Sequence, residues 1–295
     1  MPSRLRHWCA CTLTAVAFGS LCLHAQKGPA LADLLRAAAD YLVKYAQQLS
    51  SVVAEEEYQQ RDTSAAREIA TRLLRSEYVL VGLDDGAVAG FRDVFESDGS
   101  ALRERTDRLL TLFRIPPTAA SLERAQKVSD ESVRHYLSPD LIWLDEPTLP
   151  LEFLRQKYQE RSTFTFNGVR TLDGSQVAIV RFKERSTPRF IQSPGNAPVS
   201  GSYWVDVVSG AVRRTELILG GKNFDFRVTV NYAIEPKLGL WLPVDMYQRI
   251  DISGVDSGGS SELGGSFSYP ARRSLEAHAT YSKFRQVSVG LTEAK

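Results

Sequence analysis

The sequence predicts an α+β fold in which an antiparallel sheet is covered on one side by amphipathic helices. Apolar residues recur at helical spacing in residues 31–53, and the period changes to two from Ser162 onward. Turn signals, rather than helical segments, separate the later runs. The chain has 295 residues, of which 43% are hydrophobic and 24% charged, so it can bury a substantial core.

The charge balance excludes one class of partner. Lys and Arg together number 36, and Asp and Glu number 35. Because nucleic-acid and anionic-membrane binding rest on an excess of positive charge, neither is expected.

Residues 1–25 resemble a secretory signal peptide. Arg4 and Arg6 precede an uncharged apolar run, and the small residue Ala25 ends it. We expect cleavage and a secreted or periplasmic protein without a transmembrane anchor; an uncleaved anchor and lipidation of Cys22 are the alternatives. All three cysteines lie within this segment, so the mature chain would have no disulfide and no thiolate metal site.

Residues 26–295 are expected to form one domain, of which residues 26–160 are helix-rich with a single hairpin. A long helix is predicted from Leu31 to Val53, ending near Glu55–Tyr58, and a hairpin is predicted at 77–96 around the turn Asp84-Asp85-Gly86. Helices are predicted between Arg103 and Leu137, where Pro116-Pro117 interrupts them and Thr118 caps the second one. A short helix is predicted from Leu151 to Tyr158.

Residues 161–295 are expected to form the antiparallel sheet. The strand candidates are Thr163–Val169, Val177–Lys183, Ser202–Val208, Val212–Leu219, Phe224–Tyr232, Leu240–Ile252 and Ala277–Val289. Asp173-Gly174 and Ser209-Gly210 provide hairpin turns. Residues 253–275 are rich in Gly and Ser and are predicted to be a flexible loop.

Apolar and polar residues alternate in the last strands, so one face of the sheet should be buried by the helices. If the packing leaves a gap, it would be an apolar cavity suited to an acyl chain. The residues expected to line it are Phe224, Phe226, Val228, Val230, Leu242, Val244 and Met246 on strands, with Leu42, Leu49 and Phe113 on helices.

Catalytic motifs are missing from the sequence. It contains no HExxH, no GxSxG elbow and no phosphate-binding P-loop, so we expect no enzyme, no metal site and no cofactor. The mature chain has two histidines, His135 and His278, which leave an unrecognised hydrolase as a minor alternative. The paired carboxylates, at 55–57, 84–85 and 145–146, are interpreted as solvated turns and helix ends.

Glu56 is an exception among the carboxylates. It falls four residues after Val52, where the apolar stripe of the predicted helix would continue. A carboxylate there needs a partner, and Arg92, Arg103 and Arg105 are the candidates. We interpret Glu56 as half of a buried ion pair rather than as a ligand-facing charge.

Residues 203–217, YWVDVVSGAVRRTEL, resemble a strand–turn–strand signature of the outer-membrane lipoprotein-carrier superfamily, D-x-x-[ST]-G-x-[IV]-x-[RK]. The matching positions are Asp206, Ser209, Gly210, Val212 and Arg214. The mature chain as a whole, with GFRDVFE at 90–96, is similar to a group of secreted bacterial proteins. The resemblance implies a curved half-barrel with helices on its concave face, which holds lipid or acyl chains or serves a periplasmic sensor or scaffold.

Two functions therefore lead. The first is a non-enzymatic binding protein with a lipid-like ligand between sheet and helices, which requires a cavity. The second is a periplasmic scaffold or sensor that binds a protein partner, which predicts no cavity and an exposed apolar patch instead.

Overall fold

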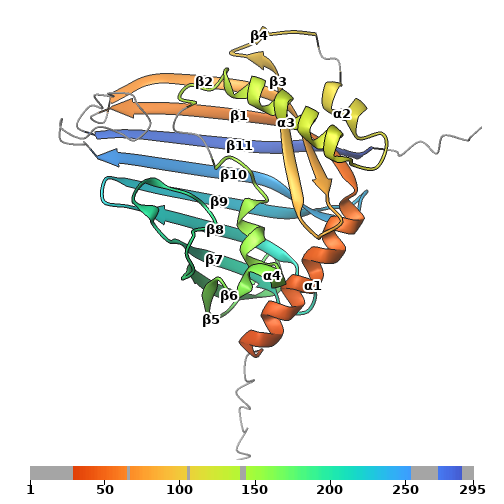
Figure 1. Ribbon diagram of the computed structural model, residues 1–295, viewed down its shortest axis with the longest axis vertical. Coiled ribbons are helices and arrows are strands. Elements are labelled where there is room, and N and C mark those ends of the chain that lie inside the picture. Colours follow the sequence, from red (N-terminus) through yellow and green to blue (C-terminus); the bar gives the residue numbers. More distant parts are fainter. Residues whose placement is uncertain (1–28, 65–66, 105–106, 140–143, 254–271, 288–295) are drawn as a thin grey trace, which may run out of the picture.

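The computed structural model describes residues 29–64, 67–104, 107–139, 144–253 and 272–287, and its centre is one antiparallel sheet of eleven strands (Figure 1). The strands are β1 (Ser51–Ser64), β2 (Arg67–Gly82), β3 (Val88–Ser97), β4 (Ser100–Ala101), β5 (Ser162–Leu172), β6 (Ser175–Glu184), β7 (Val199–Asp206), β8 (Val212–Gly220), β9 (Phe224–Glu235), β10 (Leu240–Ser253) and β11 (Arg272–Gln286). Their order is β4-β3-β2-β1-β11-β10-β9-β8-β7-β6-β5, so the sheet is open. The predicted α+β class is confirmed.

The helical elements are short apart from two. They are α1 (Leu31–Leu49), α2 (Arg108–Leu112), α3 (Ala119–Val133), the 3-10 helices η1 (Leu149–Leu154) and η2 (Pro194–Asn196), and α4 (Gln156–Gln159). As predicted, Thr118 caps α3, where its hydroxyl accepts a hydrogen bond from the Ser121 amide at 3.1 Å.

The predicted end of the first helix is wrong. The helix stops at Leu49, Ser50 adopts a φ of 49°, and the chain turns directly into β1. β1 pairs with β2 on one side and with β11 on the other, and these two ladders override the helical spacing of Val52 and Val53. The first half of the chain thus contributes four strands to the sheet instead of one hairpin.

The strands of the second half are confirmed in outline. Asp173 and Gly174 both have positive φ, 47° and 78°, as a tight hairpin turn between β5 and β6 requires. Most of the predicted loop at 253–275 lies outside the described residues. Its end was mispredicted, because β11 already begins at Arg272.

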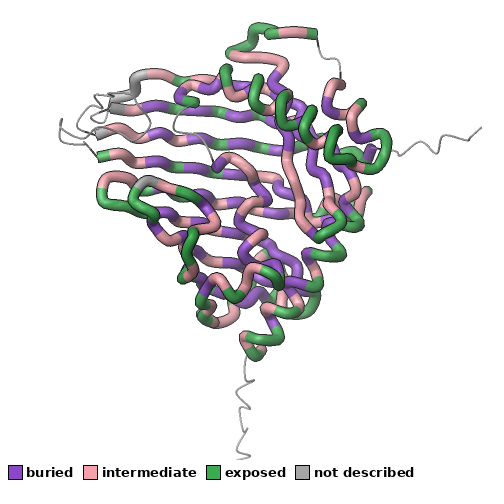
Figure 2. The backbone as a smooth tube through the Cα atoms, in the orientation of Figure 1, coloured by how far each residue is buried: buried purple, intermediate pink, exposed green. Residues whose placement is uncertain are grey.

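The two faces of the sheet differ. We call the face that carries Tyr58, Val230 and Leu242 the inner face, and the face that carries Arg61 and Arg249 the outer face. The inner face packs against α1 and η1 in one large apolar cluster. Figure 2 shows buried residues alternating with more exposed ones along the strands. The outer face is the more solvent-exposed one, which agrees with the predicted alternation of apolar and polar residues in β9 and β10.

The outer face has its own smaller cluster at one corner of the sheet. Val53 and Val79 belong to it, whereas their neighbours Val52 and Leu80 belong to the large cluster. Successive side chains of a strand point to opposite faces, so the smaller cluster lies on the outer face. Helices therefore cover part of both faces, with α2 on the outer side.

Candidate functional site: the inner face of the sheet

Most residues predicted to line a cavity meet on the inner face. Within the large cluster, the exposed fraction of each side chain is between 0% and 3% for Phe226, Val228, Val230, Leu242, Met246, Leu42 and Leu49. The period-two alternation of the strands and the helical spacing of α1 thus predict the side chains that are buried between sheet and helix.

Three predicted residues are not among the buried members of this cluster. Val244 is the extra residue of a β-bulge between Pro243 and Asp245, and it is only partly buried. Phe224, at the start of β9, packs against the large cluster but is only partly buried. Phe113 packs in the smaller outer cluster, where its ring stacks on Phe91 with centroids 5.6 Å apart.

Aromatic residues that the sequence did not single out fill the inner face. Phe153 of η1 packs on Phe182, with ring centroids 5.1 Å apart, and Phe182 packs on Tyr203 at 5.0 Å. The short helix was predicted, but nothing in its sequence indicated that it faces the sheet. With η1 in place, the space between α1 and the strands is occupied by side chains.

A further segment, residues 144–150, crosses the inner face and is held there through its main chain; we call it the crossing segment. Its carbonyl groups accept hydrogen bonds from three inner-face side chains: Gln248 to Leu144 at 2.6 Å, Tyr232 to Pro147 at 2.6 Å, and Tyr203 to Pro150 at 2.7 Å. The Tyr58 hydroxyl donates to Gln248 Oε1 at 2.7 Å and so fixes the orientation of that amide. These bonds satisfy carbonyls of a backbone packed on the sheet, of which only that of Pro150 lies in a helix, η1.

A buried ion pair lies next to the crossing segment. The Arg92 guanidinium donates to both oxygens of Glu56, with Nε–Oε2 at 2.5 Å and Nη2–Oε1 at 2.7 Å. It also bonds the carboxylate of Asp145, to which the Tyr136 hydroxyl donates at 2.5 Å. The predicted pairing of Glu56 with Arg92 is confirmed, although Glu56 lies on a strand and not on a helix.

Aromatic rings surround this guanidinium. Its carbon lies 4.9 Å from the ring centre of Tyr58, 5.2 Å from that of Tyr78 and 5.7 Å from that of Tyr136. Rings at these distances stabilise a cation electrostatically. Arg92 thus joins β1, β3, the end of α3 and the crossing segment in one contact.

Glu146 is the second carboxylate of the crossing segment. It is partly buried, and the Thr148 hydroxyl donates to its Oε1 at 2.6 Å. Burial raises the pKa of Glu146 above its ordinary value. A side chain at Gly90 would overlap this carboxylate and the Tyr78 hydroxyl, which explains the glycine. The interpretation of residues 145–146 as a solvated pair was wrong, because the irregular segment around them is packed onto the sheet.

We expect Glu146→Gln to stabilise the protein at neutral pH. Because the folded state raises the pKa of Glu146, folding favours its protonated form, and stability falls as the pH rises from the unfolded pKa towards the folded one. Glutamine carries no charge, so the variant does not lose this stability. The difference in unfolding free energy between Glu146→Gln and the wild type should therefore grow over this pH range and then level off, at about 1.4 kcal/mol per unit of pKa shift. Urea unfolding of both proteins between pH 4 and pH 8 measures this difference in unfolding free energy. The exposed Glu131→Gln variant is the control, and an equal pH dependence in both variants would contradict the prediction.

The two histidines do not form a catalytic arrangement on the inner face. His278 bonds the Asp245 carboxylate on the outer face, and its neighbours in the ladders are Gln59 and Tyr247. Neither neighbour is the nucleophile of a serine-type triad. His135 follows α3, where burial and nearby arginines lower its pKa. The described residues contain no group of three or more His, Cys, Asp or Glu placed to hold a metal ion.

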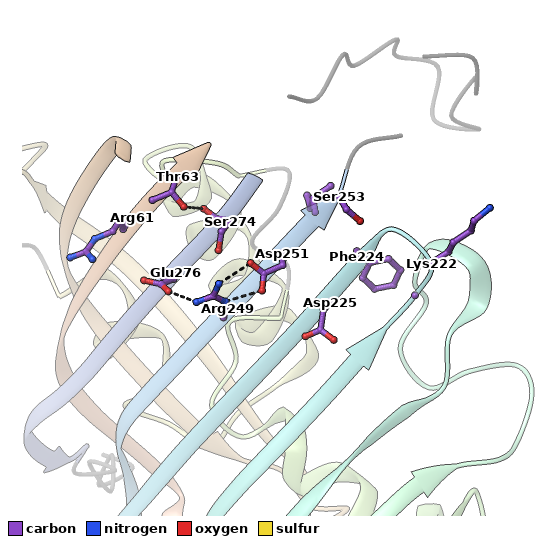
Figure 3. A pocket seen from close by; sticks show the side chains of 12 residues that line it. Arg61, Thr63, Lys222, Phe224, Asp225, Arg249, Asp251, Ser253, Ser274 and Glu276 are labelled. Atoms are coloured by element: carbon purple, nitrogen blue, oxygen red, sulfur yellow. Dashed lines mark hydrogen bonds and ion pairs between the residues drawn. The ribbon is translucent and has the colours of Figure 1, made fainter. Parts of the chain in front are cut away.

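The outer face has a hollow of about 620 Å³ near the β8–β9 turn, shown in Figure 3. Of the predicted site residues, only Phe224 lines it. Its lining has as many cations (Arg61, Lys222 and Arg249) as carboxylates (Asp225, Asp251 and Glu276), and Arg249 donates to Asp251 at 2.8 Å and to Glu276 at 2.8 Å. We call it the neutral hollow.

Comparison with known proteins finds similarity in solved structures. No protein-family model matches the chain, and no curated protein sequence matches it. A domain from Vibrio parahaemolyticus, described as an outer-membrane lipoprotein-sorting protein, is 12% identical with a TM-score of 0.39; the match covers 88% of this chain and 93% of that one. A LolA-superfamily protein from Nitrosomonas europaea is 10% identical with a TM-score of 0.33, covering 84% and 92%.

A third match is the complex of MucA and MucB from Pseudomonas aeruginosa. It is 10% identical with a TM-score of 0.20, and the match covers 84% of this chain and 98% of that one.

Proposed function

We propose that this protein is a non-enzymatic binding protein of the periplasm or the extracellular space, and that it binds a protein partner on its surface rather than a lipid inside its core. We therefore prefer the scaffold or sensor that binds a protein partner to the binding protein with a lipid-like ligand.

One observation carries this proposal. A cavity wide enough for an acyl chain would leave its wall residues open to a molecule of the size of water. Seven of the ten residues expected to form that wall lie in the large cluster and are at most 3% exposed, and η1 and the crossing segment lie where the ligand would be. A filled core favours a scaffold or sensor over a carrier.

Export is part of the same proposal and rests on the charged and apolar pattern of residues 1–25. In the part of the chain that the structure describes, no helix is long and apolar enough to cross a membrane.

Native mass spectrometry of the protein, purified from a periplasm without detergent, tests the proposal. We expect the mass of a chain that begins near Gln26, with no bound lipid. Trp241 is partly buried against the large cluster, so its fluorescence reports on the inner face. We expect no change in that emission when a fatty acid is added. A co-purifying lipid, or a saturable change in emission, would restore the lipid-binding function.

A further inference from the structure

A second hollow on the outer face, of about 740 Å³, lies over β5, β6, β7 and β8. Its position follows from the alternation of these strands. Phe182 of β6 and Tyr203 of β7 point inward, so the residues next to each of them on its strand point outward. The outward residues that line the hollow are Thr163, Thr165, Arg181, Lys183, Ser200, Ser202, Glu216 and Ile218.

The ladders place two cations between two pairs of hydroxyls. Arg181 is paired with Thr165 on β5 and with Ser202 on β7. Lys183 is paired in the same way with Thr163 and Ser200. Paired side chains lie within about 5.5 Å at their β-carbons. The short hydroxyl residues leave space, and the two long cationic side chains border it about 7 Å apart along β6.

The charge of this hollow is not neutralised. Among the described residues, the side chains of Arg181 and Lys183 have no ion-pair or hydrogen-bond partner. Of the two lining carboxylates, Glu216 is paired with Arg227 at 2.8 Å. Glu184 points inward and accepts a hydrogen bond from the Phe190 amide at 2.6 Å. The neutral hollow, in contrast, contains its own counter-charges.

We propose that this hollow binds an oxyanion, a phosphate or carboxylate group of a polar ligand, between Arg181 and Lys183. The planar guanidinium offers two parallel donors to such a group, the ammonium offers a point charge, and the hydroxyls of Thr163, Thr165, Ser200 and Ser202 complete the shell of donors. The site lies on the opposite side of the sheet from the core, so it does not depend on the partner-binding function proposed above.

Titration with inorganic phosphate at low ionic strength, followed by amide NMR shifts, tests the site. We expect saturable shifts in β6 and β7 of the wild type. The double variant Arg181→Gln/Lys183→Gln should bind about tenfold more weakly or worse, because hydrogen bonds to charged groups are lost. Both positions are exposed, so the fold should persist, which circular dichroism checks. Arg170→Gln is the matched control, since Arg170 is an exposed cation on β5 outside the hollow.

Vesicle co-sedimentation identifies the source of the anion. Binding to phosphatidylglycerol but not to phosphatidylcholine vesicles, lost in the double variant, would support a lipid headgroup. Binding of phosphate without vesicle binding would support a soluble ligand. Equal affinity of the wild type and the double variant, or no binding of phosphate or of phosphatidylglycerol, would overturn the proposal.

Discussion

Replacing Arg92 with methionine is expected to lower the free energy of unfolding by about 3–5 kcal/mol, the usual cost of breaking a buried ion pair from one side. The variant leaves Glu56 buried and Asp145 without its cation, and it removes the contact that ties the crossing segment to β1 and β3. Chemical denaturation, monitored by tryptophan fluorescence, measures the change.

Arg75→Met is the matched control for this experiment. Arg75 lies on β2 with its side chain 38% exposed, and it pairs with Glu57 at 3.8 Å and with Glu96 at 3.5 Å; solvated pairs of this kind contribute about 0–1 kcal/mol each. Glu56→Gln should also destabilise, and the double variant with Arg92→Met should lose less than the two single changes together. Similar losses from Arg92→Met and Arg75→Met would refute a buried charge centre.

Met246→Ala should cost about 2–5 kcal/mol. Met246 is 0% exposed and lies between Val230 of β9 and Ala279 of β11, so its removal leaves a void that a packed core cannot close. Thermal and urea unfolding measure the loss. In the wall of a lipid cavity, the same change would instead alter fatty-acid affinity with little effect on stability.

Val43→Ala is the control for Met246→Ala, because it removes side-chain volume at an exposed position. Val43 is 46% exposed on α1, and alanine has the higher helix propensity, so the change in stability should stay within about 0.5 kcal/mol. Comparable unfolding midpoints for Met246→Ala and the wild type would count against the filled core and for a ligand cavity.

The sequence predicted the strands of the second half because their inner positions are apolar and every second residue is polar. It failed for β1 because the inward positions of that strand include Glu56, Gln60 and Asp62. Two of these side chains accept hydrogen bonds from residues that follow α3: Gln60 accepts one from the Leu137 amide at 2.7 Å, and Asp62 accepts one from the Ser138 hydroxyl at 3.1 Å. A strand with a polar buried face has no period-two signal.

The candidate site was predictable only in its apolar part. Alternation identifies Phe226, Val228 and Val230 as inward-facing, whatever packs against them. The position of the crossing segment depends on Tyr203, Tyr232 and Gln248, which are far from it in sequence. Contacts of this kind follow from the assembled sheet and not from local pattern, so the packing of Asp145 and Glu146 onto the sheet could not be recognised.

The place of β11 between β1 and β10 has a consequence for how the chain folds. Lys283 and Glu55, which form an ion pair across two adjacent strands, are 228 residues apart in sequence. β1 therefore cannot form its ladder with β11 until β11 has been synthesised. Contacts of such long range slow folding and leave strand edges exposed in the meantime. A chain that crosses a membrane from its amino terminus would complete this sheet only on the far side.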